Sequence, residues 1–109
     1  MEEILLKSNY KEIAILTLNS PKNLNALSDA MLDALKLSLE EIEQSKNIKA
    51  VIIKAAGRAF CPGHDLKEMQ EKRNLKKDGG KAYFEKLLSK CTNVMKLIRE
   101  LPQPVIAEV

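Results

Sequence analysis

The chain has 109 residues, enough for one small domain with a modest core. It is 45% hydrophobic and 30% charged with a net charge of +3, a balance typical of globular proteins and not of disordered or membrane-embedded chains. No apolar run approaches the roughly 20 residues that a membrane-spanning helix requires, so the sequence predicts no membrane-embedded segment.

The first half of the chain predicts a hairpin, a helix and a buried strand. Strands are expected at Ile4–Ser8 and Glu12–Leu18, with the turn at Asn9–Lys11. After the break at Pro21, a helix is expected from Ser28–Asp29, because both residues are good N-caps. Its apolar positions recur every three or four residues at Met31, Leu35, Leu39 and Ile42. The β-branched run Ala50–Ala55 is typical of a buried parallel strand.

The second half predicts a loop at Gly57–His64, a short helix from Asp65 and a long helix over Tyr83–Leu101. The stripe of that long helix comprises Phe84, Leu87, Leu88, Cys91, Val94, Met95, Ile98 and Leu101. A last strand is expected at Val105–Val109. Because no covering helix follows this strand, we expect residues 1–109 to be an incomplete domain.

Several kinds of site are disfavoured by the residues available. Cys61 and Cys91 form no C-x-x-C pair, and the single histidine, His64, cannot complete a zinc-ligand set with them, so we predict no metal site and reduced thiols. The basic stretch 71–80 contains no aromatic residue and is predicted to be a solvated loop, which disfavours a nucleic-acid partner. The acidic start Met1–Lys7 resembles neither a signal nor a transit peptide, which favours a cytoplasmic location, with a mature mitochondrial form as the alternative.

The loop Gly57–Leu66 is the candidate chemical centre. It leaves the carboxyl end of a buried strand, where open α/β sheets usually bind ligands. Gly63 permits close approach to the backbone, and Asp65 can cap the next helix. An N–H held in such a turn suits an oxygen that becomes negative in a transition state. On spacing alone, an ordinary tight turn is the favoured explanation of the pattern.

Three ordered segments resemble the crotonase superfamily, the enoyl-CoA hydratase/isomerase family. Ala59–Met69 is similar to its A-F-(small)-(small)-G-x-D-[LI]-K-E-M segment. Ser20–Ser28 is similar to its P-x-x-x-N-A-L-[ST] segment, and Leu101–Ala107 to its P-[KQ]-P-[VT]-I-A strand. Together they span nearly the whole chain in the family's order.

The resemblance implies an α/β fold, a crotonase-like spiral of ββα units, with residues 1–109 as the N-terminal part of one such domain. It implies an acyl-CoA substrate, no cofactor apart from the coenzyme A of that substrate, and a homotrimer or hexamer. The backbone N–H of His64 would donate to the thioester oxygen. The residues implied to contact CoA or substrate are Lys22, Asn23, Leu24, Ala26, Cys61, Pro62, Gly63, Asp65, Leu66 and Lys67.

The family's second oxyanion donor and its two catalytic glutamates would lie beyond Val109, so residues 1–109 alone are expected to be inactive. Two positions depart from the family pattern. Pro62 replaces a small residue and deletes an N–H, and Glu108 interrupts an apolar strand.

Other assignments compete with these. The His64 ring could act as a base, and Cys61 as a nucleophile, although a small wall residue is the simpler interpretation of Cys61. Glu40, Glu41 and Glu43 are interpreted as a solvated helix face, and Glu68 as a surface residue. For the whole protein, the leading hypothesis is enoyl-CoA hydration or isomerisation. The alternatives are a non-catalytic chain that binds CoA or full-length subunits, and an RNA-binding derivative of the fold.

Overall fold

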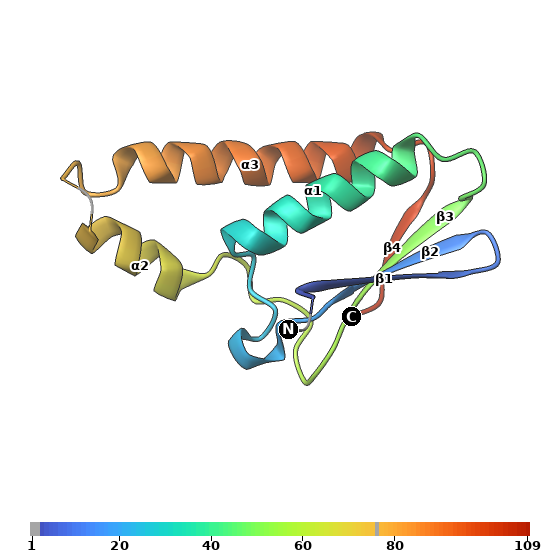
Figure 1. Cartoon of the computed structure of the whole chain (residues 1–109), viewed down its shortest axis with the longest axis horizontal. Coiled ribbons are helices and arrows are strands. Elements are labelled where there is room, and N and C mark those ends of the chain that lie inside the picture. Colours follow the sequence, from blue (N-terminus) through green and yellow to red (C-terminus); the bar gives the residue numbers. More distant parts are fainter. Residues whose placement is uncertain (1–2, 76) are drawn as a thin grey trace.

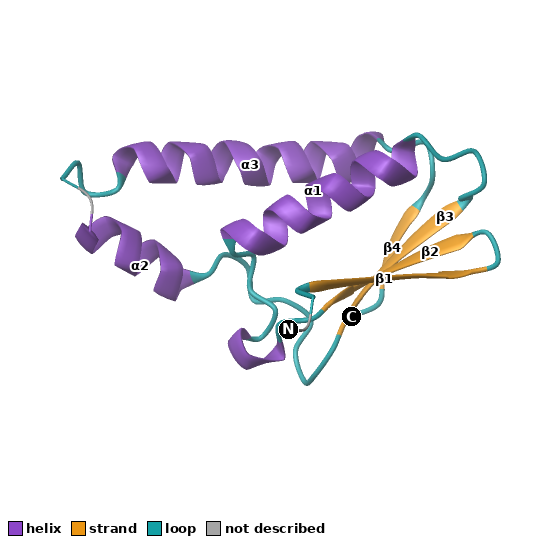
Figure 2. Cartoon of the chain, viewed as in Figure 1, coloured by secondary structure: helices purple, strands orange, loops and turns teal. Residues whose placement is uncertain are grey.

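The computed structural model describes residues 3–75 and 77–109. Its four-stranded sheet has the order β1-β2-β3-β4 (Figure 2). β1 and β2 are antiparallel, whereas β3 is parallel to both β2 and β4. The predicted hairpin and the predicted parallel strand are therefore confirmed. The strands are β1 (Leu5–Tyr10), β2 (Ile13–Leu18), β3 (Ala50–Ala55) and β4 (Val105–Ala107).

The helices lie on one side of this sheet and beyond its edge. Figure 1 shows α1 and α3 running beside each other, with α2 at the end remote from the strands. Lys90 of α3 forms ion pairs with Asp29 at 3.2 Å and with Asp33 at 3.0 Å, both on α1. The helices are η1 (Pro21–Asn23), α1 (Asp29–Glu43), α2 (Leu66–Leu75) and α3 (Lys81–Glu100). None of those in the described residues combines the length and apolar character needed to cross a bilayer.

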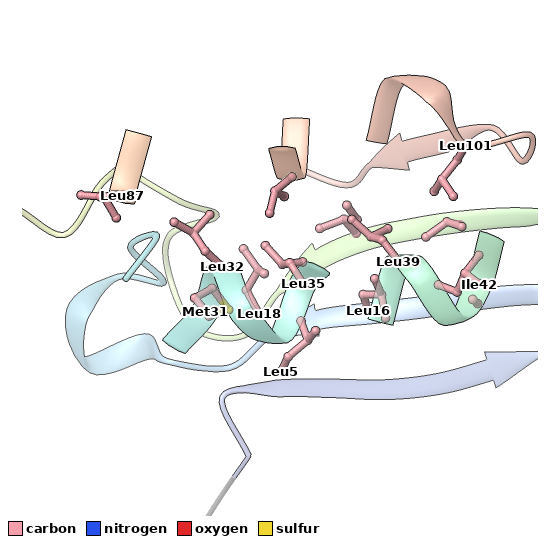
Figure 3. Packing of buried hydrophobic residues seen from close by; sticks show 14 residues of the cluster. Leu5, Leu16, Leu18, Met31, Leu32, Leu35, Leu39, Ile42, Leu87 and Leu101 are labelled. Atoms are coloured by element: carbon pink, nitrogen blue, oxygen red, sulfur yellow. The ribbon is translucent and has the colours of Figure 1, made fainter. Parts of the chain in front are cut away.

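The α1 helix forms where the sequence predicted it and contributes more residues to the buried core than any other element described. Ser28 is its N-cap, and the Ser28 hydroxyl accepts a hydrogen bond from the Met31 amide at 3.2 Å. All four predicted apolar positions are buried, and they pack on leucines that project from the strands (Figure 3). Because strand side chains alternate, Leu16 and Leu18 of β2 face α1 together.

The hairpin turn differs from the prediction. Strand β1 continues to Tyr10, which pairs with Ile13, so the loop is Lys11–Glu12 and not Asn9–Lys11. Lys11 adopts φ 55°, the left-handed geometry that lets a two-residue loop follow the twist of its strands. Polarity alone did not indicate which residue would take this geometry.

The long helix begins at Lys81 and ends at Glu100, and its predicted stripe is only partly correct. Leu87 and Val94 are buried, as is Leu101, which follows the helix. Leu88 and Met95, however, are 56% and 45% exposed. The α3 helix packs chiefly on α1, and a helix with one main neighbour buries a narrow line of residues. The sequence period could not say how wide that line would be.

The segment 71–80 was predicted to be a loop, but α2 continues to Leu75 and a turn at residues 77–80 follows. Residue 76 of that prediction lies outside the described residues. The prediction relied on polarity, but Glu, Lys, Arg and Gln are good helix formers. None of the residues of α2 is fully buried, so polar residues suit the helix along its whole length. The last strand is also shorter than predicted, because β4 ends at Ala107.

Candidate functional site

Two loops meet at the carboxyl ends of β2 and β3. Since these strands are parallel neighbours, the segments that follow them leave the same edge of the sheet. The Leu27 amide donates to the Gly63 carbonyl at 2.7 Å, and Leu27 and His64 form an isolated parallel bridge. The Asn23 amide group also donates to the Asp65 carboxylate at 3.2 Å. The two segments singled out from the sequence, 22–26 and 61–67, are therefore neighbours (Figure 1).

Asn25 holds the two loops together. It is fully buried and adopts φ 62°, a left-handed geometry that asparagine tolerates better than most residues. Its Nδ2 donates to the carbonyls of Ala56 at 2.8 Å and Ala59 at 2.9 Å, while its Oδ1 accepts from the Ser20 amide at 2.7 Å. Sequence reasoning did not include Asn25 among the site residues. The feature of the sequence that could have identified it is the asparagine of the P-x-x-x-N-A-L-[ST] pattern, which is Asn25 in the segment Ser20–Ser28.

The turn at Gly63 presents a backbone donor. Gly63 adopts φ 109°, which side-chain-bearing residues rarely adopt, and an added Cβ would meet no atom within 4 Å. The space beside this glycine is therefore open. Within residues 3–75 and 77–109, no group accepts a hydrogen bond from the His64 amide. Within the described part of the chain, the turn thus combines an N–H that has no acceptor with room for a ligand to approach it.

Asp65 caps α2 as predicted. Its Oδ1 accepts from the Glu68 amide at 3.1 Å, and its carbonyl accepts from the Met69 amide at 3.1 Å. The negative charge also lies at the positive end of the helix dipole. This cap fixes the residues that immediately follow the His64 amide.

The side chains of His64 and Cys61 show no catalytic partnership in the described part of the chain. His64 is half-buried, and its Nδ1 is buried without a hydrogen-bond partner there. The Cys61 thiol lies 3.9 Å from the Gly63 carbonyl, a weak contact within its own loop. Cys61 and Cys91 are both free thiols. No group of three metal-ligating side chains is present among the residues described.

The remaining predicted contact residues differ in accessibility. Lys22, Pro62, Leu66 and Lys67 are exposed, and Leu24 is half-buried. Ala26 as a whole residue is only 5% exposed, so it offers little surface to a ligand. Glu108 is exposed, as are Glu40, Glu41 and Glu43, which confirms the solvated face predicted for α1.

The surface assignment of Glu68 is wrong. Glu68 is half-buried, and its Oε1 accepts from the Asp29 amide at 2.9 Å and from the Tyr83 hydroxyl at 3.0 Å. Burial, followed by the hydrogen bond and charge of Glu68, raises the pKa of Tyr83 above its ordinary value. The contact joins three helices through residues that lie 39 and 15 positions from Glu68, which local pattern could not reveal.

A separate hollow lies elsewhere on the surface. It measures about 610 Å³, lies between α1 and α3, and is lined by charged and polar side chains that include Asp33, Lys36, Lys86 and Lys90. Neither Gly63 nor His64 borders it. Charged side chains predominate in its lining and Lys90 forms ion pairs there, so we interpret it as a solvated groove between two helices. We therefore place the candidate site at the glycine turn.

Comparison with known proteins identifies the family. The sequence model of enoyl-CoA hydratase/isomerase matches residues 13–109. Human mitochondrial enoyl-CoA hydratase domain-containing protein 3 is 40% identical over 94 residues, which are 86% of this chain and 29% of that protein. The putative enoyl-CoA hydratase/isomerase YngF of Bacillus subtilis is 38% identical over 109 residues, which are 99% of this chain and 39% of that protein.

The fold matches as well. The crystal structure of an enoyl-CoA hydratase from Mycobacterium smegmatis has a TM-score of 0.86 at 43% identity, covering 97% of this chain and 39% of that one. The chain therefore spans between 29% and 39% of the length of these proteins and corresponds to their N-terminal part. The likeness confirms the predicted crotonase fold. The chain belongs to the enoyl-CoA hydratase/isomerase family of the crotonase superfamily.

Proposed function

We propose that this chain binds an acyl-CoA thioester and that the His64 backbone N–H stabilises the negative charge that develops on the thioester oxygen. The proposed reaction of the whole protein is the hydration or isomerisation of an enoyl-CoA. The observation that carries this proposal is the His64 amide, which has no hydrogen-bond acceptor among the described residues and lies beside the open space at Gly63. Membership of the family supports a CoA-thioester substrate.

The geometry suits this task because the donor is fixed before a ligand arrives. Gly63 leaves room for the thioester, and Asp65 caps the next helix directly after the donor. A preorganised donor costs little reorganisation when charge develops, and removal of one such donor typically costs about 3 to 4 kcal/mol of transition-state stabilisation. The second donor and the proton-transferring carboxylates are assigned to the family's segments beyond residue 109.

The CoA contacts proposed for this chain come from both loops. Lys22 would face the phosphates, since it is exposed on the loop beside the glycine turn. No cofactor other than the coenzyme A of the substrate is proposed. The protein is proposed to assemble as a homotrimer or hexamer, in the cytoplasm or in mitochondria. The proposed contact residues are Lys22, Asn23, Leu24, Ala26, Cys61, Pro62, Gly63, Asp65, Leu66 and Lys67.

Isotope-edited infrared spectroscopy tests the proposal directly. Butyryl-CoA labelled with ¹³C at the thioester carbonyl is bound to the protein as encoded, and the carbonyl band is compared with that of the free ligand. A shift to lower frequency, together with hydration or isomerisation of an enoyl-CoA in a parallel assay, is expected from donation to the thioester oxygen. Binding without turnover would favour the non-catalytic alternative, and the absence of binding would overturn the proposal.

A further inference from the structure

The first turns of α1 and α2 lie beside each other below the start of α3 (Figure 1). The Glu68 carboxylate of α2 contacts both of the other helices. Counted from the cap Asp65, Glu68 is the third residue of α2, the position at which a glutamate commonly reaches back to its own N-cap amide. Here it reaches across to the first amide of α1, at Asp29.

The contact closes a set of hydrogen bonds around the glycine turn. On one side, the Leu27 amide holds the Gly63 carbonyl at 2.7 Å. On the other side, Glu68 holds the Asp29 amide at 2.9 Å, and the Glu68 amide in turn donates to Asp65 at 3.1 Å. The His64 amide lies between these two attachments.

The Tyr83 hydroxyl makes the attachment more rigid. It donates to the same Oε1 at 3.0 Å, so a residue of α3 restricts the rotamers open to Glu68. The carboxylate also lies at the N-termini of both α1 and α2, where a negative charge is stabilised. Three helices therefore determine where this oxygen lies.

We propose that Glu68 is a positioning residue for the His64 backbone N–H, acting by tying the first turn of α2 to the first turn of α1. This inference rests on the proposed function, because the donor matters only if a thioester oxygen binds there. Glu68 itself contacts neither the substrate nor the reacting atoms in this proposal.

The test compares Glu68→Ala with Glu68→Gln in the protein as encoded. Alanine removes the acceptor, whereas glutamine keeps an acceptor oxygen for the Asp29 amide and the Tyr83 hydroxyl. Glu71→Ala, an exposed glutamate one turn further along α2, is the matched control. We expect kcat for Glu68→Ala to fall about tenfold at nearly constant KM, since the lost alignment acts chiefly in the transition state.

Two further readouts separate positioning from general stability. In Glu68→Ala, the labelled thioester carbonyl band should move back toward its free-ligand frequency, and the amides of Gly63–Asp65 should exchange hydrogen faster. Glu68→Gln should restore both readouts and kcat, while Glu71→Ala should leave them unchanged. Tyr83→Phe should produce the same changes in smaller measure, and it provides the test if Glu68→Ala fails to fold.

The possible failures are distinguishable. If the unaltered protein shows no carbonyl shift, the proposed function fails and this inference with it. If that shift is present but a folded Glu68→Ala retains it along with unchanged exchange and kcat, the inference alone is overturned. The inference is likewise overturned if Glu68→Gln loses as much kcat as Glu68→Ala. The charge of Glu68, and not its hydrogen bonds to Asp29 and Tyr83, would then matter.

Discussion

Asn25 donates a hydrogen bond of 2.9 Å to the carbonyl of Ala59, which lies 34 positions further along the chain. This bond and the companion bond to Ala56 join the loop after β2 to the loop after β3. The candidate site therefore depends on a buried polar side chain that would contact no ligand. The effect of replacing Asn25 on the free energy of unfolding can be measured separately from its effect on activity.

Replacement of Asn25 should be strongly destabilising. Asn25→Ala leaves the Ala56 and Ala59 carbonyls and the Ser20 amide without their partner, at about 1 to 3 kcal/mol for each group that remains buried. We expect a loss of about 3 kcal/mol or more in the free energy of unfolding, measured by urea denaturation. Asn23→Ala, which removes one exposed hydrogen bond to Asp65, is the control and should cost less than about 1 kcal/mol. Equal losses in the two variants would contradict the role given to Asn25.

The backbone and the ring of His64 can be separated by mutation. His64→Ala keeps the N–H and removes a ring whose Nδ1 has no partner among the described residues, so most of kcat/KM should remain. Gly63→Val forces a branched side chain into φ 109° and fills the open approach, which should lower kcat/KM on the order of a hundredfold. Both variants are first checked for folding by circular dichroism. If His64→Ala loses most of its kcat/KM while Gly63→Val keeps nearly all of it, the chemistry belongs to the ring.

Charge reversal at Lys22 tests the proposed phosphate contact. Lys22 is exposed on the loop that hydrogen-bonds to the glycine turn, so Lys22→Glu should weaken CoA binding at low salt. The loss should shrink as the salt concentration rises, because exposed charges are screened. Titration calorimetry at two ionic strengths measures both effects, with Lys46→Glu near the opposite end of α1 as the control. An unchanged dissociation constant at low salt removes Lys22 from the site.

The pKa of Tyr83 predicts a pH dependence of stability. Burial and the neighbouring Glu68 raise this pKa above the ordinary 10.0, so the unfolded chain releases the phenolic proton at a lower pH than the folded chain. The contribution to stability is complete below the unfolded pKa and is lost as the pH rises toward the folded one. The advantage of the unaltered protein over Tyr83→Phe should therefore shrink from about pH 9 to about pH 11.

Urea denaturation across this range measures the effect on the free energy of unfolding. Tyr10→Phe serves as the control, because Tyr10 is 61% exposed and lies at the end of β1. A constant difference between the unaltered protein and Tyr83→Phe would show that the Tyr83 hydroxyl does not carry this dependence.

Much of the local structure could be predicted from sequence because its causes are local. Ser28 caps α1 through a bond to a residue three positions away, and the apolar period of α1 coincides with its buried face. The boundaries of β3 were predicted because a β-branched run there is bounded by turn residues. The glycine and aspartate of the turn likewise act within their own loop, so Gly63 was identified correctly as leaving the backbone open to close approach and Asp65 as a cap.

The features that only the tertiary structure decided depend on contacts between segments that are far apart in the sequence. The sequence determined the family, the order of strands and helices, and the loop that holds the candidate donor. It could not show that Leu88 and Met95 are exposed, because burial depends on how α3 lies on its neighbour. It also could not show that Asn25 joins two loops or that Glu68 joins three helices. A hydrogen bond between residues far apart in sequence leaves no local period, and its partners become evident only when packing brings them within about 3 Å.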